Sequence, residues 1–458
     1  MRTFFLVGLI LILVICAPAA AAVTAVATNS SPSQTPAPTS VSPSVMPGAS
    51  AGVQATAPAP GVRGVFGSPV TFATHDELAS FGFNAGPSDG QFGAIPAGGA
   101  NYVFYGFAAP SNTCAGTKKG AGAFSFTGTL DHVTGSNGCR RVFGRGDGPQ
   151  GWIFDRDYAG GGQVVRFALN GQSGWLMPFH GEAWWQNPDT PDHKCNVSQG
   201  ATVPCFYSAL GLAVSTDESK TFKVVGEILQ PSQPISAFSG SGKSMMVGYG
   251  SLVVADANGK HLDNPPAHSN DAFFYLFYTD LLPGAPGVCT SQLCLGVARA
   301  PYAKVIQAAL SGDPHQVAKV FHKYDGASPN PWTQPATSDT PDLSGSAGRY
   351  APLITDETGG AEVIYDKAFD VYLAVFGTGK GLVVRASNDL LHWSQPIGAP
   401  YHEAGRVTFF PTFIGETGDP TIAGPAPRLY FSSFPIGSYP DYKTAVFESV
   451  QLTLSKAP

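Results

Sequence analysis

Four carboxyl side chains stand in strand-like stretches where they could carry acid–base chemistry. Asp155 and Asp157 are two residues apart, so a strand would place both carboxylates on one side. Glu182 follows His180 by two residues and shares its face, where the imidazole could tune the acid. Glu362 opens a later apolar run. Paired carboxyl groups cleave glycosidic bonds, at separations of about 5 Å for retention and roughly 6.5–9.5 Å for inversion.

The working hypothesis makes Asp155 the base or nucleophile and Glu182 the general acid, with Asp157 and His180 orienting and tuning them. Structural interpretations stay open beside it. The aspartates could accept hydrogen bonds in a turn or pair with a nearby arginine, and Glu182 could form an ion pair at a rim. His180 could be a buried structural histidine. Glu362 is the further catalytic candidate, and we expect it to be half exposed.

Aromatic and basic residues supply candidates for substrate binding. Trp184 and Trp185 could stack on the apolar face of a sugar ring or pack in the core. Arg299 and Arg349 could bind a carboxylated sugar or pair with aspartates in the interior. A loop with His261 and nearby acids matches no known metal spacing. We therefore expect neither a metal nor a cofactor.

The elements that position these residues are short strands separated by turns. The chain has 55 Gly and 39 Pro in 458 residues and only 13% charged residues, which favours many short strands over helical bundles. The expected strands group into five units, at 101–107 and 123–130; three runs within 152–229; 245–255, 272–278 and 293–299; 361–365, 371–376 and 381–387; and 407–414, 428–433 and 445–454. One helical turn is expected at 75–81 and a helix at 303–310.

A sheet of three or four short strands cannot bury both of its faces, so neighbouring units must stack. Radial repetition of such sheets gives a β-propeller. The sequence therefore predicts an all-β fold, a five-bladed β-propeller of four-stranded antiparallel blades. Two stacked β-sandwiches are the alternative fold.

Two strand ends carry a shared motif with a turn function. Ser215-Thr-Asp217-Glu-Ser219-Lys-Thr-Phe222 is close to S-x-D-x-G-x-T-W, and Ser387-Asn-Asp-Leu-Leu-His-Trp is close to S-x-D-x-x-x-W. In both, the Asp can accept backbone N–H groups across a hairpin while the aromatic residue packs beneath it. Ser219 and Phe222 stand where the first pattern has Gly and Trp.

These motifs resemble the Asp-box of sialidase-type propellers and the strand ends of five-bladed glycosidases of the arabinanase, xylosidase and fructosidase type. The resemblance covers about residues 100 to 454. It implies a propeller fold and a glycoside hydrolase activity, and it implies that the motifs themselves are structural. The catalytic motifs W-[ML]-N-D-P-N-G, R-D-P and E-C of better-known members are absent from the sequence.

The N-terminal region predicts export. Met1-Arg2 and a short apolar run ending in alanines are typical of a signal peptide at 1–22. Residues 23–60 are rich in Ser, Thr, Pro and Ala and predict a disordered linker, so the propeller domain is expected at 61–458. The mature chain should have no transmembrane segment, and we expect a secreted, periplasmic or cell-surface protein.

Six cysteines follow the signal region, and in an exported protein they predict disulfides. Proximity in sequence favours the pairs Cys114–Cys139, Cys195–Cys205 and Cys289–Cys294, each closing one loop. Net charge is −6 and no basic run occurs, so nucleic acid is not an expected partner.

The sequence thus predicts a monomeric, exported glycoside hydrolase acting on an oligosaccharide or polysaccharide. The alternative is a non-catalytic propeller that binds glycan or protein at the cell surface. The two differ at the axial mouth of the ring, where an enzyme should gather carboxylates.

Overall fold

The computed structural model describes residues 61–81, 90–108, 122–184, 194–196, 202–238, 247–265, 270–280, 294–327, 329–355, 361–378, 381–439 and 441–457. The predicted signal peptide and linker lie outside these residues and stay predictions.

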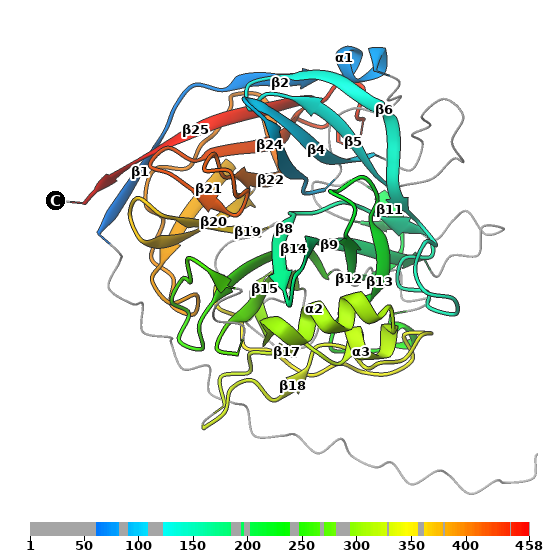
Figure 1. The fold of residues 1–458 in the computed structure, drawn as a ribbon. Coiled ribbons are helices and arrows are strands. Elements are labelled where there is room, and N and C mark those ends of the chain that lie inside the picture. The colour runs from blue at the N-terminus through cyan, green and yellow to red at the C-terminus, as the bar shows by residue number, and fades with distance from the viewer. Residues whose placement is uncertain are drawn as a thin grey trace, which may run out of the picture. The chain divides into compact units, whose positions relative to one another are not determined.

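The described chain folds into five antiparallel blades (Figure 1). Blade 1 holds β3 (Gly93–Gly98), β4 (Asn101–Ala108), β5 (Gly122–Gly128) and β6 (Val133–Gly144). Blade 2 holds β7 (Tyr158–Ala159), β8 (Val165–Leu169), β9 (Gln172–Trp184), β12 (Phe206–Ser215) and β13 (Lys223–Leu229), with a separate hairpin of β10 (Lys194–Asn196) and β11 (Thr202–Pro204). Blade 3 holds β14 (Val247–Ala255), β15 (Phe273–Asp280), β16 (Cys294–Pro301), β17 (His322–Lys323) and β18 (Gln334–Pro335).

Blade 4 holds β19 (Ala361–Asp366), β20 (Val371–Thr378) and β21 (Gly381–Ser387), and the short β23 (Ile422–Ala423) adds to it in parallel. Blade 5 holds β22 (Arg406–Ile414), β24 (Arg428–Pro435) and β25 (Val446–Lys456), joined by β1 (Val62–Phe66) and β2 (Val70–Thr74). The helical segments are α1 (His75–Ser80), α2 (Tyr302–Ser311), α3 (Pro314–Ala318) and the short 3-10 turn η2 (Ile235–Ala237).

Contacts between the innermost strands close the ring. β14 touches blade 2 on one side and β19 on the other, β19 touches β22, and β22 touches β3. Blade 1 then meets blade 2 so closely that a Cβ added to Gly93 would lie 2.7 Å from the carbonyl oxygen of Gly162. The predicted five-bladed propeller is therefore confirmed, and two stacked sandwiches are not what the chain forms.

Amide side chains tie the blades together across the axis. Gln91 of blade 1 donates to the carbonyl of Ala361 in blade 4 at 3.1 Å. Gln163 of blade 2 donates to Val363 O in blade 4 and accepts from Leu252 N in blade 3, at 3.1 and 2.9 Å. The centre of the ring is thus polar, because each inner strand leaves backbone groups there that need partners.

The last blade contains the first strands of the described chain. β1 and β2 both pair with β25 in antiparallel register, from Val62↔Lys456 to Thr74↔Val446. The sequence predicts that folding begins near residue 62, but it does not assign these first strands to blade 5. Pairing the two ends of the chain in one sheet leaves no free seam in the ring.

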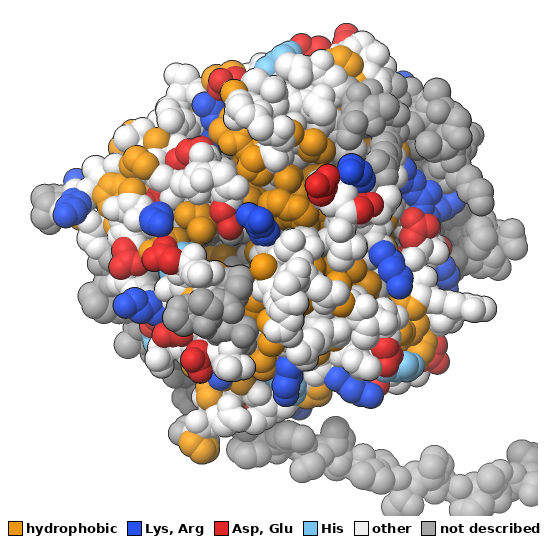
Figure 2. Space-filling view, in the orientation of Figure 1, with side chains coloured by type: hydrophobic (Ala, Val, Ile, Leu, Met, Phe, Trp, Pro, Cys, Tyr) orange, Lys and Arg blue, Asp and Glu red, His pale blue; other side chains and the backbone are white. Residues whose placement is uncertain are grey.

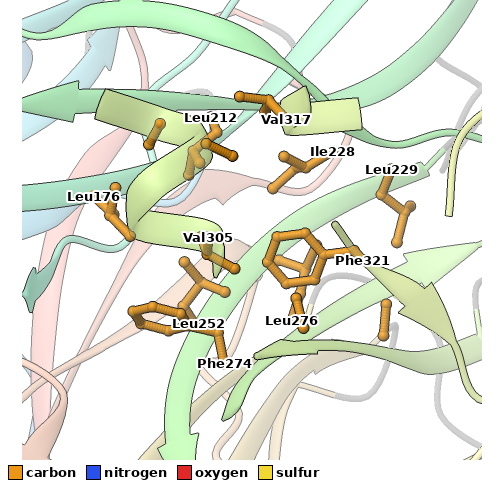
Figure 3. Close-up of a cluster of buried hydrophobic side chains, with 14 of the residues drawn as sticks. Leu176, Leu212, Ile228, Leu229, Leu252, Phe274, Leu276, Val305, Val317 and Phe321 are labelled. Atoms are coloured by element: carbon orange, nitrogen blue, oxygen red, sulfur yellow. The ribbon is translucent and has the colours of Figure 1, made fainter. Parts of the chain in front are cut away.

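Two helices extend the core between blades 2 and 3. The predicted helix at 303–310 is α2, and α3 follows it directly. Figure 3 shows Val305 and Val317 from these helices facing apolar side chains of blades 2 and 3, among them Leu212, Leu252 and Phe274. The helices begin where their apolar positions recur at helical spacing, so burying one face stabilises both.

In both Asp motifs the carboxylate accepts hydrogen bonds within its hairpin turn, as the sequence predicts. Asp217 accepts from the Thr221 backbone N–H at 2.9 Å and from the Ser215 hydroxyl at 2.8 Å. Asp389 accepts from the backbone N–H of His392 at 2.8 Å, and buried Trp393 packs between blades 3 and 4. The motifs therefore hold their hairpins together, which is the structural role that the sequence predicts.

The surface and the cysteines add limited constraints. Over the described residues on the face seen in Figure 2, acidic and basic side chains are interspersed. No helix within the described ranges is long and apolar enough to cross a membrane. Cys205 and Cys294 are fully buried, and the side chains of the other four cysteines lie outside the described residues. The disulfide pairing stays a prediction.

Candidate functional site

The site is built at the mouth end of the ring, which we define as the end where the inner strands begin. Blade 2 presents His180, Glu182 and Trp184 there, at alternate positions near the end of β9. Alternation places all three side chains on one face of the strand. Tyr158, at the start of the blade's inner strand, lies directly opposite Glu182 in the ladder. We call these four residues the Glu182 cluster.

The Glu182 carboxyl is held from two sides. His180 Nε2 lies 3.0 Å from Glu182 Oε1, and Trp184 Nε1 donates to Oε2 at 2.6 Å. The Tyr158 ring packs edge-on against the imidazole, with centroids 5.8 Å apart. The side chains of His180 and Glu182 keep 21% and 12% of their accessible area, so the carboxyl is fixed yet reachable from solvent. A positioned carboxyl with an imidazole neighbour can exchange a proton with a ligand.

Asp157 is a second partly exposed carboxylate beside this cluster. Its Oδ2 accepts from the Trp184 backbone N–H at 2.6 Å and from Arg156 at 2.8 Å. The Asp157 backbone N–H in turn donates to the carbonyl of Glu182 at 3.0 Å. Asp157 is thus hydrogen-bonded to the strand that carries Glu182 and paired with Arg156, and both its orienting role and its catalytic role stay predictions.

The local structure around Asp155 differs from the strand that alternation predicts. Residues 152–157 form turns, not a strand, so Asp155 and Asp157 do not share a strand face. Asp155 is completely buried, and its Oδ2 accepts from the Gly148 backbone N–H at 2.8 Å. Burial raises the pKa of Asp155 to about 6, against the lowering effect of backbone hydrogen bonds such as that from Gly148. This geometry favours the loop-acceptor interpretation over contact with substrate.

Glu362 lies in the polar centre of the ring. We expected it to be half exposed, but it is completely buried, because inner strands from both neighbouring blades enclose it. Burial raises its pKa well above the ordinary value, and the nearby Thr412 hydroxyl and Gln163 amide only partly oppose this. Glu362 is therefore a buried component of the hub and is not among the residues of the Glu182 cluster.

The predicted arginines and the second tryptophan do not join the cluster. Arg299 lies toward the opposite end of blade 3, where its guanidinium stands 4.7 Å from the Phe273 ring and 4.3 Å from the Trp332 ring. Arg299 therefore packs between two aromatic side chains at that end of the blade. Arg349 is exposed in the loop between β18 and β19. Trp185 lies outside the described residues.

The sequence missed an aromatic pair at the mouth end. Tyr249 and Phe410 sit at β-bulges in the inner strands of blades 3 and 5, and both have left-handed backbone, with φ of 61° and 57°. Such a conformation costs a bulky L-residue about 1–3 kcal/mol. Glycine and proline next to an aromatic residue, in Gly248-Tyr-Gly and Phe-Phe-Pro411, were the available signal of a bulge.

A second carboxyl pair lies on blade 5. Ser433 Oγ donates to Glu403 Oε2 at 2.9 Å and receives a hydrogen bond from Arg406 Nε at 2.6 Å. Glu448 is nearly buried beside them. Burial, followed by the neighbouring Glu403, raises the pKa of Glu448 to about 7. Glu448 is enclosed between strands of blade 5, whereas the Glu403 side chain keeps 26% of its accessible area and also pairs with Arg406 at 3.4 Å.

A cavity of about 330 Å³ lies at the other end of the ring, where the inner strands end. Val165, Val254 and Ile422 line it together with His261, whose ring stacks on Tyr365 at 3.7 Å. Its walls do not include the Glu182 cluster. Within the described ranges, no group of three or more His, Cys, Asp or Glu side chains is arranged to hold a metal ion.

Fold and site together define a five-bladed propeller with an anchored carboxyl at its mouth end. Scans against protein-family models and against the curated proteins gave no match. Solved structures similar to the chain include a GH62 α-L-arabinofuranosidase domain from Coprinopsis cinerea (11% identity, 86% of this chain and 98% of that chain, TM-score 0.44). Another is the α-L-arabinofuranosidase PaAbf62A from Podospora anserina (12% identity, 87% and 99%, TM-score 0.45). A family 117 glycoside hydrolase from Zobellia galactanivorans is also similar (7% identity, 85% and 90%, TM-score 0.44).

Proposed function

We propose that the protein is an exported glycoside hydrolase that cleaves an oligosaccharide or polysaccharide at the mouth end of the propeller. One observation carries the proposal. Glu182 is held by His180 and Trp184 in a partly exposed position, with the aromatic rings of Tyr158 and Trp184 beside it. Tyr158 is buried behind the imidazole, and a fixed carboxyl next to the partly exposed Trp184 ring suits a sugar, whose rings have apolar faces and hydroxyl edges.

Glu182 acts as the general acid in this proposal. Glu182 gives a proton to the glycosidic oxygen as the bond from that oxygen to the anomeric carbon breaks, while His180 Nε2 holds the carboxyl at Oε1. Water supplies the hydroxyl that the anomeric carbon receives. Asp157, the partly exposed carboxylate beside the cluster, takes the remaining proton of that water and returns it to solvent, and solvent restores the proton that Glu182 gave up.

Asp155 and Glu362 are not assigned to the reaction. Both are completely buried, and a substrate could reach neither without opening the ring. The alternative function, glycan binding without hydrolysis, uses the same aromatic surface and needs no proton transfer. The two functions therefore differ in one measurable result. A hydrolase releases product from the glycan that it binds, and a binding protein does not.

The test is hydrolysis of a panel of aryl glycosides and of plant and bacterial polysaccharides. We expect Glu182→Gln to lower kcat by about 10²-fold or more, with an unchanged thermal midpoint. Glu218→Gln is the matched control, because Glu218 is an exposed turn residue of blade 2 that pairs only with Lys220 among the described residues. Full activity of Glu182→Gln contradicts the site, and glycan binding without product from the wild type favours the non-catalytic alternative.

A further inference from the structure

Two bulges at matching positions bring aromatic residues to the axis. In blade 3 the register shifts between Gly248 and Ser251, and in blade 5 it shifts between Phe409 and Thr412. In both blades the first residue inside the shift is aromatic and has a left-handed backbone: Tyr249 in blade 3 and Phe410 in blade 5. The hydroxyl that follows each bulge then bonds to the next inner strand, Ser251 Oγ accepting from Val363 N at 3.0 Å. Thr412 Oγ1 accepts from Phe92 N at 3.3 Å.

The residue types at the two bulges are costly for the backbone. Glycine occupies the left-handed region freely, whereas a bulky L-residue there is a genuine outlier. Both bulges nonetheless carry a large ring at that position. Bulges are frequent beside functional sites, where they redirect a side chain out of the regular alternation. Strain retained twice at equivalent positions points to a use for the rings themselves.

The Tyr249 and Phe410 side chains meet at the mouth end of the propeller. Their centroids lie 6.0 Å apart with an interplanar angle of 25°. Blade 4 lies between blades 3 and 5 in the ring of blades, so the two aromatic side chains meet from blades that are not sequential neighbours. Phe409 continues the aromatic surface outward over blade 5, 5.8 Å from Phe410 and 4.5 Å from Tyr439. All four rings are partly exposed.

The aromatic surface adjoins the Glu182 cluster. Gly248 precedes Tyr249 directly, and a Cβ at Gly248 would lie 3.4 Å from His180 Nδ1. The backbone that carries Tyr249 therefore passes beside the imidazole that bonds Glu182.

We propose that Tyr249, Phe410, Phe409 and Tyr439 form a platform that binds a chain of sugar residues, with Tyr249 and Phe410 under the sugars nearest to Glu182. The inference rests on the proposed function. Its substrate class is an extended oligosaccharide whose successive rings turn apolar C–H faces to the aromatic side chains. A single sugar would use only the part of the platform beside His180.

The backbone geometry supplies variants that separate a binding role from a structural one. Tyr249→Gly and Phe410→Gly each remove a ring and also remove the cost of the left-handed backbone, so they should fold with little change in thermal midpoint. Tyr249→Ala removes the ring and keeps the backbone cost. Tyr249→Phe keeps the ring and is the conservative control.

The probes are linear arabino-, xylo- and galacto-oligosaccharides as tri- and hexasaccharides, together with the monosaccharides, measured by calorimetry. We expect the wild type to bind a hexasaccharide more tightly than its monosaccharide. Each glycine variant should weaken hexasaccharide binding about tenfold, whereas Tyr249→Phe should bind as the wild type does. Phe409→Ala should weaken binding of the hexasaccharide more than of the trisaccharide.

The failure of the platform and the failure of the proposed function give different results. If the glycine variants fold and bind like the wild type while Glu182→Gln is inactive, the platform is wrong and the hydrolase stands. If Tyr249→Ala weakens binding but Tyr249→Gly does not, the loss comes from backbone strain that disturbs the fold and not from the missing aromatic side chain. The platform is then again wrong. If the wild type binds no member of the panel and cleaves none, both proposals fall.

Discussion

At the residue scale, Asp155 shows how a loop can hold a carboxyl away from water. The side chain ties its turn to Gly148, and a Cβ on that glycine would lie 2.7 Å from Asp155 Oδ1. This close approach leaves no room for solvent, so the charged form is disfavoured and the pKa rises to about 6. The protonated form is the one that the fold stabilises.

This carboxyl gives the stability of the protein a pH dependence of known sign. The pKa is higher in the folded chain than in the unfolded chain, so the contribution of Asp155 is fully present below pH 4 and is lost as the pH rises through about 6. Its size is about 3 kcal/mol. In Asp155→Asn the amide oxygen still accepts from Gly148 and the side chain no longer titrates. The variant should therefore gain stability relative to the wild type between pH 4 and pH 7.

Urea unfolding of both proteins across this range measures the difference directly. The comparison cancels other titrating groups, such as Asp366, whose pKa burial also raises to about 6. Asp217→Asn is the control of opposite sign. Burial acts to raise the pKa of Asp217, but hydrogen bonds led by that from Thr221 outweigh it and lower the pKa. A difference between wild type and Asp155→Asn that does not change with pH would contradict the buried-carboxyl account.

Residue roles were less predictable from sequence than residue positions. The two-residue spacing of His180 and Glu182 was sufficient to place them on one face, because strand alternation is local, and the structure adds Trp184 to that face. The same rule failed at Asp155 and Asp157, since a turn there breaks the alternation. The exposure of Glu362 depends on two neighbouring blades, and no local pattern encodes that.

At the element scale, a buried charged group joins the outer edges of blades 2 and 3. Lys323 of β17 donates to the carbonyl of Gln230, just beyond β13, at 2.7 Å. Glu227 of β13 and Asp280 of β15 act electrostatically on this lysine, and all three charged side chains are completely buried. Burial lowers the pKa of Lys323 to about 8, against the raising effect of Asp280 and then Glu227.

Removing the lysine should therefore destabilise the contact between these blades. Lys323→Met leaves buried carboxyls without their cation, and we expect the free energy of unfolding to fall by about 3–5 kcal/mol. Lys319→Met is the matched control just after α3, because the Lys319 side chain is 66% exposed in its ion pair with Asp339 and its loss should cost much less. Denaturant unfolding of the two variants measures the contrast.

The double variant Lys323→Met with Glu227→Gln should recover part of the loss, since the amide removes one of the carboxyls. Equal effects of Lys323→Met and Lys319→Met would show that the buried lysine is not what holds these edges together.

Element assignment from sequence worked best where the pattern was regular. The runs in blades 3, 4 and 5 appear as β14 to β16, β19 to β21, and β22 with β24 and β25. The bulges were missed because one extra residue interrupts the alternation without ending the strand. β23 was missed because a two-residue strand has no periodicity, and it pairs with blade 4 only through the folded ring.

At the scale of the whole molecule, the ring depends on how its two ends are joined. Blade 5 needs β1 at its outer edge, where five residues pair with β25 from Val62↔Lys456 to Phe66↔Leu452. β1 also reaches blade 4, since Gly64 N donates to Ile397 O at 2.9 Å. Repeated sheets in the sequence predicted a ring, but the closing strand pairs residues from opposite ends of the domain, a separation that sequence periodicity does not report.

Truncation from the N-terminus tests this closure. A chain that starts at residue 61 keeps every described strand and should unfold at the same temperature as the full chain. A chain that starts at residue 69 loses β1, exposes the edge of β25 and removes buried Val62. We expect it to lose about 2–4 kcal/mol of stability and to aggregate more readily, because an unpaired edge strand offers backbone groups to other chains. Calorimetry and light scattering on the two truncated chains measure both effects, and equal thermal midpoints would show that the remaining strands close the ring without β1.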